Sequence, residues 1–387
     1  MLHTAEVFVN KRVAALAGVA ALAASVAACS SDSESGVDST AAASGASSVA
    51  ATGEATGAGA GLKVMATTGF IGDAVRNIAP GADLSVLIGP GGDPHSYQPT
   101  AKDIQSLMGA DVVLVNGLGL EAAMDEQLEQ LGEKTLDVST AIPRENLLEW
   151  SEEEHDHDHG EADHDHDHDH GDADADHDHD HGDADADHEH EGHHHHHAAA
   201  PGETAYDPHI WNDTDNWELV VTAIADRLAT AQPEDADTFK ANAVKYNSEI
   251  SDAKKYVQDK INTIPDKERI LVTGHDAFNY FGREFGLEIQ ATDFVTTESE
   301  KSAAEMNQLA HFIAEKKIPT IFPDNVKSPQ AATALAEIVR QEGWDVQVSD
   351  QELYAGTLGT ADTTDTYIGV LKHNADAIAE GLSAGAN

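Results

Sequence analysis

From Leu62 onward, short apolar runs alternate with longer stretches whose apolar residues are spaced three and four positions apart. Short apolar runs bounded by glycine or proline are typical of buried strands, and the longer spacing is typical of amphipathic helices. In the first part of the chain the predicted strands are "KVMATTG", "LSVLIG" and "DVVLVNG", and the helices predicted to follow them are "FIGDAVRNIAP", "TAKDIQSLMGA" and "LEAAMDEQLEQL".

The same alternation resumes after Lys267. The predicted strands there are "RILVTG", "LEIQAT", "PTIFPD" and "DVQVS", and helices are expected to begin near His275, Ser302, Ser328 and Thr363. Strands that alternate with helices usually form parallel sheets covered by those helices. The sequence therefore predicts an α/β fold of two β/α lobes with mostly parallel sheets, over residues 62–232 and 265–387.

One long helix is predicted between the two lobes, over residues 233–264. Pro233 suits its first turn, and a single apolar stripe follows at three- and four-residue steps. At about 1.5 Å per residue, roughly 30 residues reach about 45 Å, so we expect this helix to join the lobes as a rigid strut. The stripe consists of Ala236, Phe239, Ala243, Tyr246, Ile250, Ala253, Val257, Ile261 and Ile264.

The first 29 residues have the features of a lipoprotein signal peptide. Lys11 and Arg12 precede the short apolar run "VAALAGVAALAASVAA", and Cys29, the only cysteine, follows directly. Such a cysteine is the expected lipid-anchor site, so the protein is predicted to be exported and held on the outer face of the cytoplasmic membrane by lipid alone. Residues 30–61 are rich in Ser, Ala and Gly, a composition typical of a flexible tether.

Charge narrows the possible partners. The chain has 22 Lys and Arg residues against 70 Asp and Glu residues, which gives a formal net charge of −48. Such acidity disfavours nucleic acid and anionic membrane surfaces and favours cations. We therefore expect no nucleic-acid partner and a membrane contact only through the lipid anchor. The protein is also expected to be a monomer.

Three isolated histidines occupy loop positions. His95 lies in "GPGGDPHSYQPT" after a predicted strand, His209 in "YDPHIWND", and His275 in "RILVTGHDAFNYF" where a strand ends. Ligands of α/β sheets bind beyond the carboxyl ends of strands, which places His95 and His275 where both lobes could contribute. Three neutral imidazoles suit zinc and leave one coordination position open. His3, His311 and His373 lie in the signal region or in helical runs, where ligation is not expected.

These segments resemble a known family. "DPHSYQPT", "DPHIWND" and "GHDAFNYFGREFGLEIQ", in this order and with a long helix between the last two, are similar to the metal-binding lipoproteins of ABC importers for zinc and manganese, the zinc-uptake protein A family. The resemblance extends from Leu62 to Leu382. It implies two β/α lobes clamped on a metal ion, His95, His209 and His275 as ligands, and delivery of zinc to an ABC permease and its ATPase.

The sequence departs from the family pattern at one position. The family usually has an aspartate as fourth ligand where this chain has Gly356 in "QELYAGTLG". The fourth position could be filled by water, or by Asp362 or Asp365. Manganese, which prefers oxygen ligands, loses more than zinc by this absence, so zinc is favoured and manganese is the alternative.

Residues 152–197 form an insertion of very unusual composition. The stretch from His155 to Asp187 repeats every eleven residues, as in "HDHDHGDADAD", and the insertion holds 17 of the 23 histidines. A purification tag would lie at a terminus, and a merely solvated acidic linker would have no need of histidine. Histidine-rich loops also occur in the zinc-preferring branch of the family. We interpret residues 152–197 as a disordered loop that binds several zinc ions weakly, either as a collector or as a sensor beside the primary site.

Two other classes of function stay open from the sequence. Three histidines with an open position also describe catalytic zinc sites, but no HExxH-type helix or acid–base pair accompanies them, so an enzyme is not expected. The other class is a surface lipoprotein that buffers zinc or contacts host material without a transporter. Neighbouring genes for an ABC ATPase and a permease would exclude this second class, and their absence would favour it.

Overall fold

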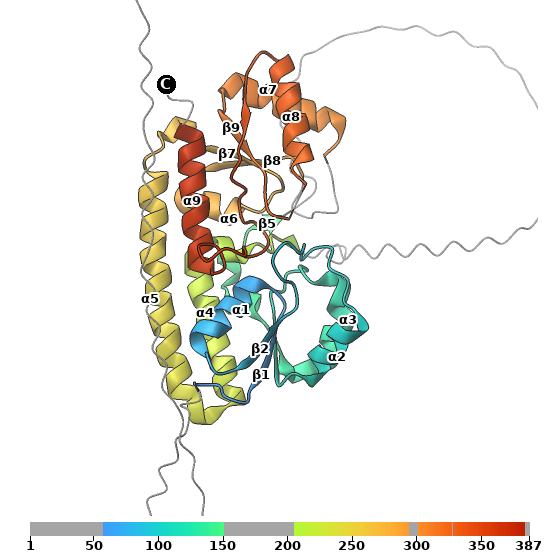
Figure 1. The fold of residues 1–387 in the computed structure, drawn as a ribbon, viewed down its shortest axis with the longest axis vertical. Helices are drawn as coiled ribbons and strands as arrows, with labels where there is room; N and C mark the ends of the chain where they lie inside the picture. The colour runs from blue at the N-terminus through green and yellow to red at the C-terminus, as the bar shows by residue number, and fades with distance from the viewer. Residues whose placement is uncertain (1–56, 151–204, 294–300, 327, 384–387) are drawn as a thin grey trace, which may run out of the picture. The chain divides into compact units, whose positions relative to one another are not determined.

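The computed structural model describes residues 57–150, 205–293, 301–326 and 328–383. Two four-stranded sheets dominate this part of the chain (Figure 1). The sheet of the N-terminal lobe has the order β2-β1-β3-β4, and that of the C-terminal lobe has the order β10-β9-β7-β8. All strand pairs within these two sheets are parallel. The predicted α/β class with two mostly parallel lobes is therefore confirmed.

Each lobe consists of a sheet with helices on both of its faces. In the N-terminal lobe the elements are β1 (Lys63–Ala66), α1 (Gly69–Ile78), β2 (Asp83–Val86), α2 (Ala101–Gly109), β3 (Val112–Val115), α3 (Asp125–Leu131), β4 (Thr135–Asp137) and α4 (Thr214–Ala231). In the C-terminal lobe they are β7 (Ile270–Thr273), α6 (Asn279–Phe285), β8 (Glu288–Ala291), α7 (Ala303–Lys316), β9 (Thr320–Phe322), α8 (Gln330–Gln341), β10 (Gln347–Val348) and α9 (Tyr367–Ser383).

A long helix, α5 (Ala236–Ile261), packs against elements of both lobes (Figure 1). It follows a 3-10 turn at Pro233–Asp235 and contacts α1 and α4 of the N-terminal lobe and α6 and α9 of the C-terminal lobe. The predicted apolar stripe is confirmed from Phe239 onward, because each of its members from there to Ile264 is buried. The domain boundaries at 232 and 265 remain a prediction.

The apolar core explains why the lobes are joined so firmly. One buried cluster runs without a break through β1, α1, α4, α5, α6 and α9, so the inner faces of both sheets share it. A second cluster lies under α7 and α8, and a third under α2 and α3. The two lobes are therefore continuous in their inner core and separate only in their outer layers.

Asp73 joins three helices at the centre of this core. Its carboxylate, only 2% exposed, accepts a hydrogen bond from the Tyr246 hydroxyl of α5 and another, of 3.2 Å, from the backbone N–H of Tyr367 at the start of α9. Burial raises the pKa of Asp73, and the hydrogen bond from Tyr246 opposes that rise. If one of these helices moved, the buried carboxylate would lose a hydrogen bond, which costs free energy. The arrangement therefore fixes the positions of α1, α5 and α9 relative to one another.

The structure also differs from the predicted elements. Helix α4 was not predicted, although Asp213 caps it and Trp217, Val220, Val221 and Ile224 follow at helical spacing. The helix expected near His275 begins only at Asn279, because residues 275–277 form a turn in which the Ala277 N–H bonds the His275 carbonyl. Strands β4, β5 (Glu149–Trp150) and β6 (Ala205–Tyr206) have two or three residues and are too short to leave a pattern.

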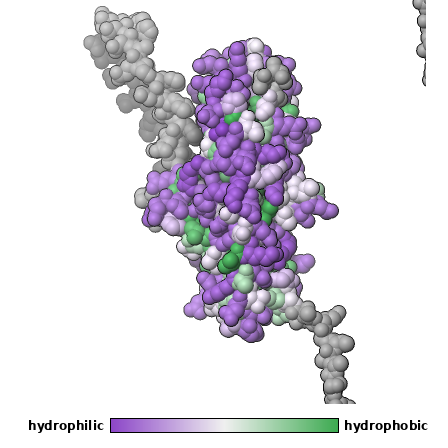
Figure 2. Space-filling view, turned by 90° about the vertical axis from the view of Figure 1, so that its left-hand side faces the viewer, coloured by the Kyte–Doolittle hydropathy of each residue, from purple (hydrophilic) through white to green (hydrophobic). Residues whose placement is uncertain are grey.

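The face shown in Figure 2 is mostly hydrophilic, with small and scattered apolar patches. Among the described residues, the large hydrophobic side chains that are well exposed are Met108, Leu219 and Val244. No helix in the described ranges has the length and apolar character that would let it span a bilayer.

Candidate metal centre

Three histidines from three distant segments of the chain lie together. Their candidate ligand nitrogens, those of His95, His209 and His275, all lie within 4.8 Å of one another. The distances between ring centroids are 5.1 Å for His95–His209, 5.3 Å for His209–His275 and 6.0 Å for His95–His275. His209 and His275 are fully buried, whereas His95 is partly exposed. Within the described ranges, no other three His, Cys, Asp or Glu side chains meet in this way.

His209 is oriented by Asp207 of the same "DPH" turn. One carboxylate oxygen of Asp207 lies 2.7 Å from His209 Nδ1 and accepts the backbone N–H of His209 at 2.9 Å. Because a carboxylate only accepts, Nδ1 carries the proton of the neutral ring, and Nε2 has the lone pair that a metal requires. The turn directs that nitrogen toward His95, with 3.1 Å between the two Nε2 atoms.

Asp207 is itself held by the C-terminal lobe. Its second oxygen accepts a 3.1 Å hydrogen bond from Asn279 Nδ2, and its carbonyl accepts a 3.0 Å hydrogen bond from the Tyr280 hydroxyl. Asn212, three residues after His209, donates through Nδ2 to the Ala277 carbonyl at 2.8 Å. The segment that carries His209 is therefore fastened to α6 and to the turn before it.

His275 follows β7 at the carboxyl edge of the C-terminal sheet. Its Nδ1 lies 2.9 Å from a carboxylate oxygen of Asp324, which comes from the end of the neighbouring strand β9. Both side chains are fully buried. Gly274 makes this approach possible, because a Cβ there would lie 2.2 Å from the same Asp324 oxygen. Asp324 therefore selects the Nδ1–H tautomer of His275, as Asp207 does for His209.

His95 is on a loop between β2 and α2 that has no regular structure. Asp93 accepts hydrogen bonds from the His95 backbone N–H at 3.0 Å and from the Ser96 hydroxyl at 3.0 Å, which shapes the turn locally. Pro94 is buried, while Gly91 and Ser96 are exposed. Of the three histidines, His95 therefore has the most access to solvent.

The spacing of the nitrogens suits a tetrahedral ion. With Zn–N bonds of about 2.0–2.1 Å, two nitrogens of a tetrahedral site lie roughly 3.3 Å apart. The 3.1 Å between the Nε2 atoms of His95 and His209 is close to that value, and all three candidate nitrogens lie within 4.8 Å of one another. Three neutral rings with nearby carboxylates suit a divalent cation.

The proposed fourth position has a distinct environment. Gly356 is buried and its backbone lies outside the left-handed region, so its conformation does not require glycine. However, a Cβ at this position would lie 2.8 Å from Val326 Cγ1 and 3.4 Å from Pro94 Cδ. Asp362 and Asp365 are both exposed and do not belong to the histidine cluster. The structure brings neither of them to the three nitrogens.

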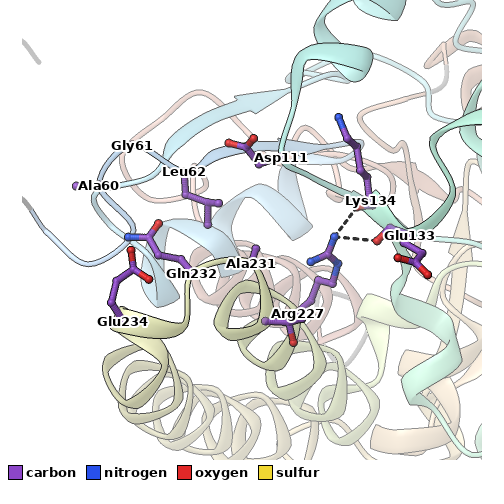
Figure 3. A pocket seen from close by; sticks show the side chains of 11 residues that line it. Ala60, Gly61, Leu62, Asp111, Glu133, Lys134, Arg227, Ala231, Gln232 and Glu234 are labelled. Carbon is purple, nitrogen blue, oxygen red and sulfur yellow. Dashed lines mark hydrogen bonds between the residues drawn. The ribbon is translucent and has the colours of Figure 1, made fainter.

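A surface groove among the described residues lies away from the three histidines (Figure 3). It has a volume of about 660 Å³ and lies near the start of β1 and the end of α4, with Asp111, Lys134, Arg227 and Glu234 among its lining residues. Its cations already serve the fold, since Arg227 donates to the carbonyls of Glu133 and Lys134, and Lys134 Nζ donates to the carbonyl of Ala110. The groove is therefore a surface depression away from the histidines.

Comparison with known proteins identifies the family. Residues 64–381 match the model of the family described as "Zinc-uptake complex component A periplasmic". The chain belongs to this family.

Characterised members of the family are similar along most of their length. The zinc-binding protein TroA of Treponema pallidum is 33% identical over 324 residues, which cover 83% of this chain and 88% of TroA. The manganese-binding lipoprotein MntA of Bacillus subtilis is 31% identical over 326 residues, with 83% and 90% covered. The solved structure of TroA superposes with a TM-score of 0.67 and covers 83% of this chain and 99% of TroA.

Some functional residues were not found by sequence reasoning. Asp207 and Asp324 were missed as the carboxylates that orient His209 and His275. For Asp207 a sequence signal existed, because "DPH" places an acid two residues before the histidine, as "DPH" also does at Asp93. Asp324 lies 49 positions from His275, so only the parallel pairing of β7 and β9 brings them together. Cys29 and residues 152–197 lie outside the described residues.

A buried acid supports the His209 turn from the N-terminal lobe. Glu121, 3% exposed, accepts the Thr67 hydroxyl at 2.6 Å and the backbone N–H groups of Asn116 and Gly117 at 2.7 and 3.1 Å. Asn116 in turn donates through Nδ2 to the Pro208 carbonyl at 2.9 Å. Burial raises the pKa of Glu121 from 4.5 to about 7, against the lowering effect of these hydrogen bonds.

This pKa predicts a pH-dependent difference in stability between the parent protein and Glu121→Gln. Folded Glu121 holds its proton up to about pH 7, whereas the unfolded chain loses it near pH 4.5, so its contribution to stability is lost as pH rises through that window. The free energy of unfolding of Glu121→Gln should rise relative to the parent by on the order of 3 kcal/mol between pH 4.5 and 7. Urea unfolding of both metal-free proteins at several pH values measures this difference. A constant difference across the window would contradict the raised pKa.

Proposed function

We propose that this protein is the extracytoplasmic binding component of a metal importer and that it captures zinc through His95, His209 and His275. The convergence of three histidines, two of them buried and oriented by carboxylates, supports this proposal most directly. Membership of the zinc-uptake family and the similarity to TroA and MntA support the transport role. TroA and MntA are named as metal-binding proteins, and the relative PsaA of Streptococcus mitis is named as the substrate-binding lipoprotein of a manganese ABC transporter, which argues against an enzyme.

Zinc is proposed over manganese on the chemistry of the ligands. One relative is named as a zinc-binding protein and another as a manganese-binding protein, so similarity alone does not decide. Three imidazoles form a nitrogen-rich site, and position 356 offers no carboxylate. Manganese favours oxygen ligands, whereas zinc accepts three nitrogens and a water. Manganese binding is the alternative.

The proposed partners are the permease and ATPase of an ABC importer, and the proposed location is the outer face of the cytoplasmic membrane. The lipoprotein motif that ends at Cys29 supports the anchor, and the relative in B. subtilis is named a lipoprotein.

A Cys29→Ser chain should therefore take up no lipid label while binding zinc as the parent does. Unchanged labelling of that variant would overturn the proposed anchor.

Removal of any one histidine of the cluster should abolish tight zinc binding. His95→Ala, His209→Ala or His275→Ala leaves two firm ligands, and we expect affinity to fall more than the roughly 10- to 100-fold typical of losing an outer hydrogen-bond partner of a ligand. Isothermal titration of zinc, with manganese as competitor, measures this loss. His373→Ala is the matched control, because His373 lies on α9 outside the cluster and bonds the Glu352 carbonyl. If all three variants bind zinc as tightly as the control, the site lies elsewhere.

Deletion of residues 152–197 should leave one tight zinc site and remove several weak ones. The three proposed ligands lie outside the insertion, whereas 17 other histidines lie within it. Weak binding by the parent should also fade below about pH 6, because imidazoles with a pKa near 6.5 must lose their proton to bind metal. Zinc titration of both chains at pH 7.5 and 5.5 tests both statements. Loss of the tight site on deletion would show that the insertion supplies a ligand.

A further inference from the structure

The segment Leu353–Thr357 touches the surroundings of all three histidines, although none of its own side chains is an acid or an imidazole. It runs beside the residues that follow β9, with the Leu353 N–H bonded to the Pro323 carbonyl and the Asn325 N–H bonded to the Leu353 carbonyl, both at 2.9 Å. It is also fixed to α9, where the Asn374 side chain bonds the Tyr354 N–H and carbonyl at 2.9 and 3.0 Å.

Asn325 determines the conformation of this segment. Its Oδ1 accepts the Ala355 N–H at 2.9 Å and the Gly356 N–H at 3.4 Å. Its Nδ2 donates to the Thr357 carbonyl at 2.9 Å and to the Thr357 hydroxyl at 2.8 Å. The preceding residue, Asp324, orients His275. Two consecutive side chains therefore hold His275 on one side and the segment 353–357 on the other.

The Thr357 hydroxyl reaches across to the loop of His95. Its oxygen, in a side chain only 1% exposed, accepts the backbone N–H of Gly91 at 3.2 Å. Three residues later in that loop, Pro94 lies against Gly356, where a Cβ would stand 3.4 Å from Pro94 Cδ. These contacts join positions 266 residues apart and connect the otherwise irregular His95 loop to the C-terminal lobe.

The same segment also contacts the turn that carries His209. Trp211 Nε1 donates to the Ala355 carbonyl at 3.0 Å, and the Tyr367 hydroxyl at the start of α9 donates to the Trp211 carbonyl at 2.8 Å. His209 and His275 are thus fastened to the C-terminal lobe through several hydrogen bonds. For the His95 loop, the Gly91–Thr357 hydrogen bond is such a bond to the C-terminal lobe between described residues, four positions before His95.

We propose that Thr357 is a positioning residue that latches the His95 loop over the ion and thereby slows metal release. This inference rests on the proposed function and adds to it the step that governs retention. The bond joins the most exposed of the three histidines to the body that holds the other two. Breaking it should therefore loosen His95 first, with His209 and His275 still held by Asp207 and Asp324.

The test compares Thr357→Val, which removes the hydroxyl at nearly constant volume, with Thr357→Ser, which keeps it. The full-length protein is loaded with one equivalent of zinc, and the rate of zinc loss to an excess of a chromogenic chelator is followed by stopped flow. Thr357→Val loses the hydrogen bond from Gly91 N–H and the one from Asn325 Nδ2, of which only the first reaches the His95 loop. We expect this variant to release zinc about three- to tenfold faster, and Thr357→Ser to behave as the parent. Hydrogen exchange of the Gly91 amide, measured without metal, should rise in Thr357→Val and not in Thr357→Ser.

Thr364→Val is the matched control for loss of a buried hydroxyl. Thr364 is 2% exposed, and its hydroxyl lies 3.5 Å from the Tyr354 hydroxyl and 3.4 Å from the Ala361 carbonyl, both in the C-terminal lobe. This variant should lower the melting temperature of the metal-free protein, as Thr357→Val does, but it should not change the rate of zinc release. A purely structural role of Thr357 would make the two valine variants equivalent in every measurement.

The outcomes separate the latch from the proposed function. If Thr357→Val shows faster exchange of the Gly91 amide but the parent's rate of zinc release, the proposed role of Thr357 is wrong, because the hydrogen bond would exist without retaining the ion. Unchanged exchange and release would overturn that role as well. If the parent releases zinc without a slow phase and His209→Ala releases it at the same rate, the proposed zinc site is wrong. The proposed role of Thr357 in retention would then be wrong as well.

Discussion

The hydrogen bonds from His209 and His275 to buried carboxylates are the interactions on which the geometry of the proposed metal centre depends. An imidazole without such a partner can rotate and can protonate either nitrogen, whereas Asp207 and Asp324 each hold one ring in one tautomer. Both acids are buried, so they must be hydrogen-bonded to be tolerated. Asn279 supplies a further bond to Asp207, and the backbone N–H of Val326 bonds Asp324 at 3.1 Å. The orientation of the ligands is therefore built into the folded core.

This dependence explains why the two lobes share one core. His209 belongs to the N-terminal part of the chain, yet its turn is bonded to α6 and to the segment around Ala355 in the C-terminal part. Such bonds keep their geometry only if the lobes do not rotate freely, and the continuous apolar cluster around α5 and α9 restricts that rotation. Asp73 adds a polar contact that fixes α1, α5 and α9 together. Large rigid-body opening of the lobes would break many of these contacts at once.

The sequence predicted those features that have a local signature. Short apolar runs marked β1, β2, β3 and the four strands of the C-terminal sheet, and the apolar stripe marked α5. Each of the three histidines was identified because it lies in a loop beside a strand or in a "DPH" motif, and the structure places them together. What the sequence could not supply was pairing between distant positions. The Asp324–His275 pair and the Gly91–Thr357 bond depend on how the strands of two lobes are placed.

At position 356, glycine stands where the family usually has an aspartate, and the absence of a side chain affects how distant segments pack at this site. Without a side chain at 356, the segment can approach Pro94 and Val326 so closely that a Cβ would have to displace the valine methyl. That close approach places the Thr357 hydroxyl within reach of the Gly91 N–H. An aspartate at position 356 would have to move the Val326 side chain, whereas its Cβ would be in ordinary contact with Pro94 of the His95 loop. The contacts of the segment are therefore compatible with the proposed ligand set of His95, His209 and His275 without a carboxylate at position 356, and such a nitrogen-rich set would favour zinc over harder ions.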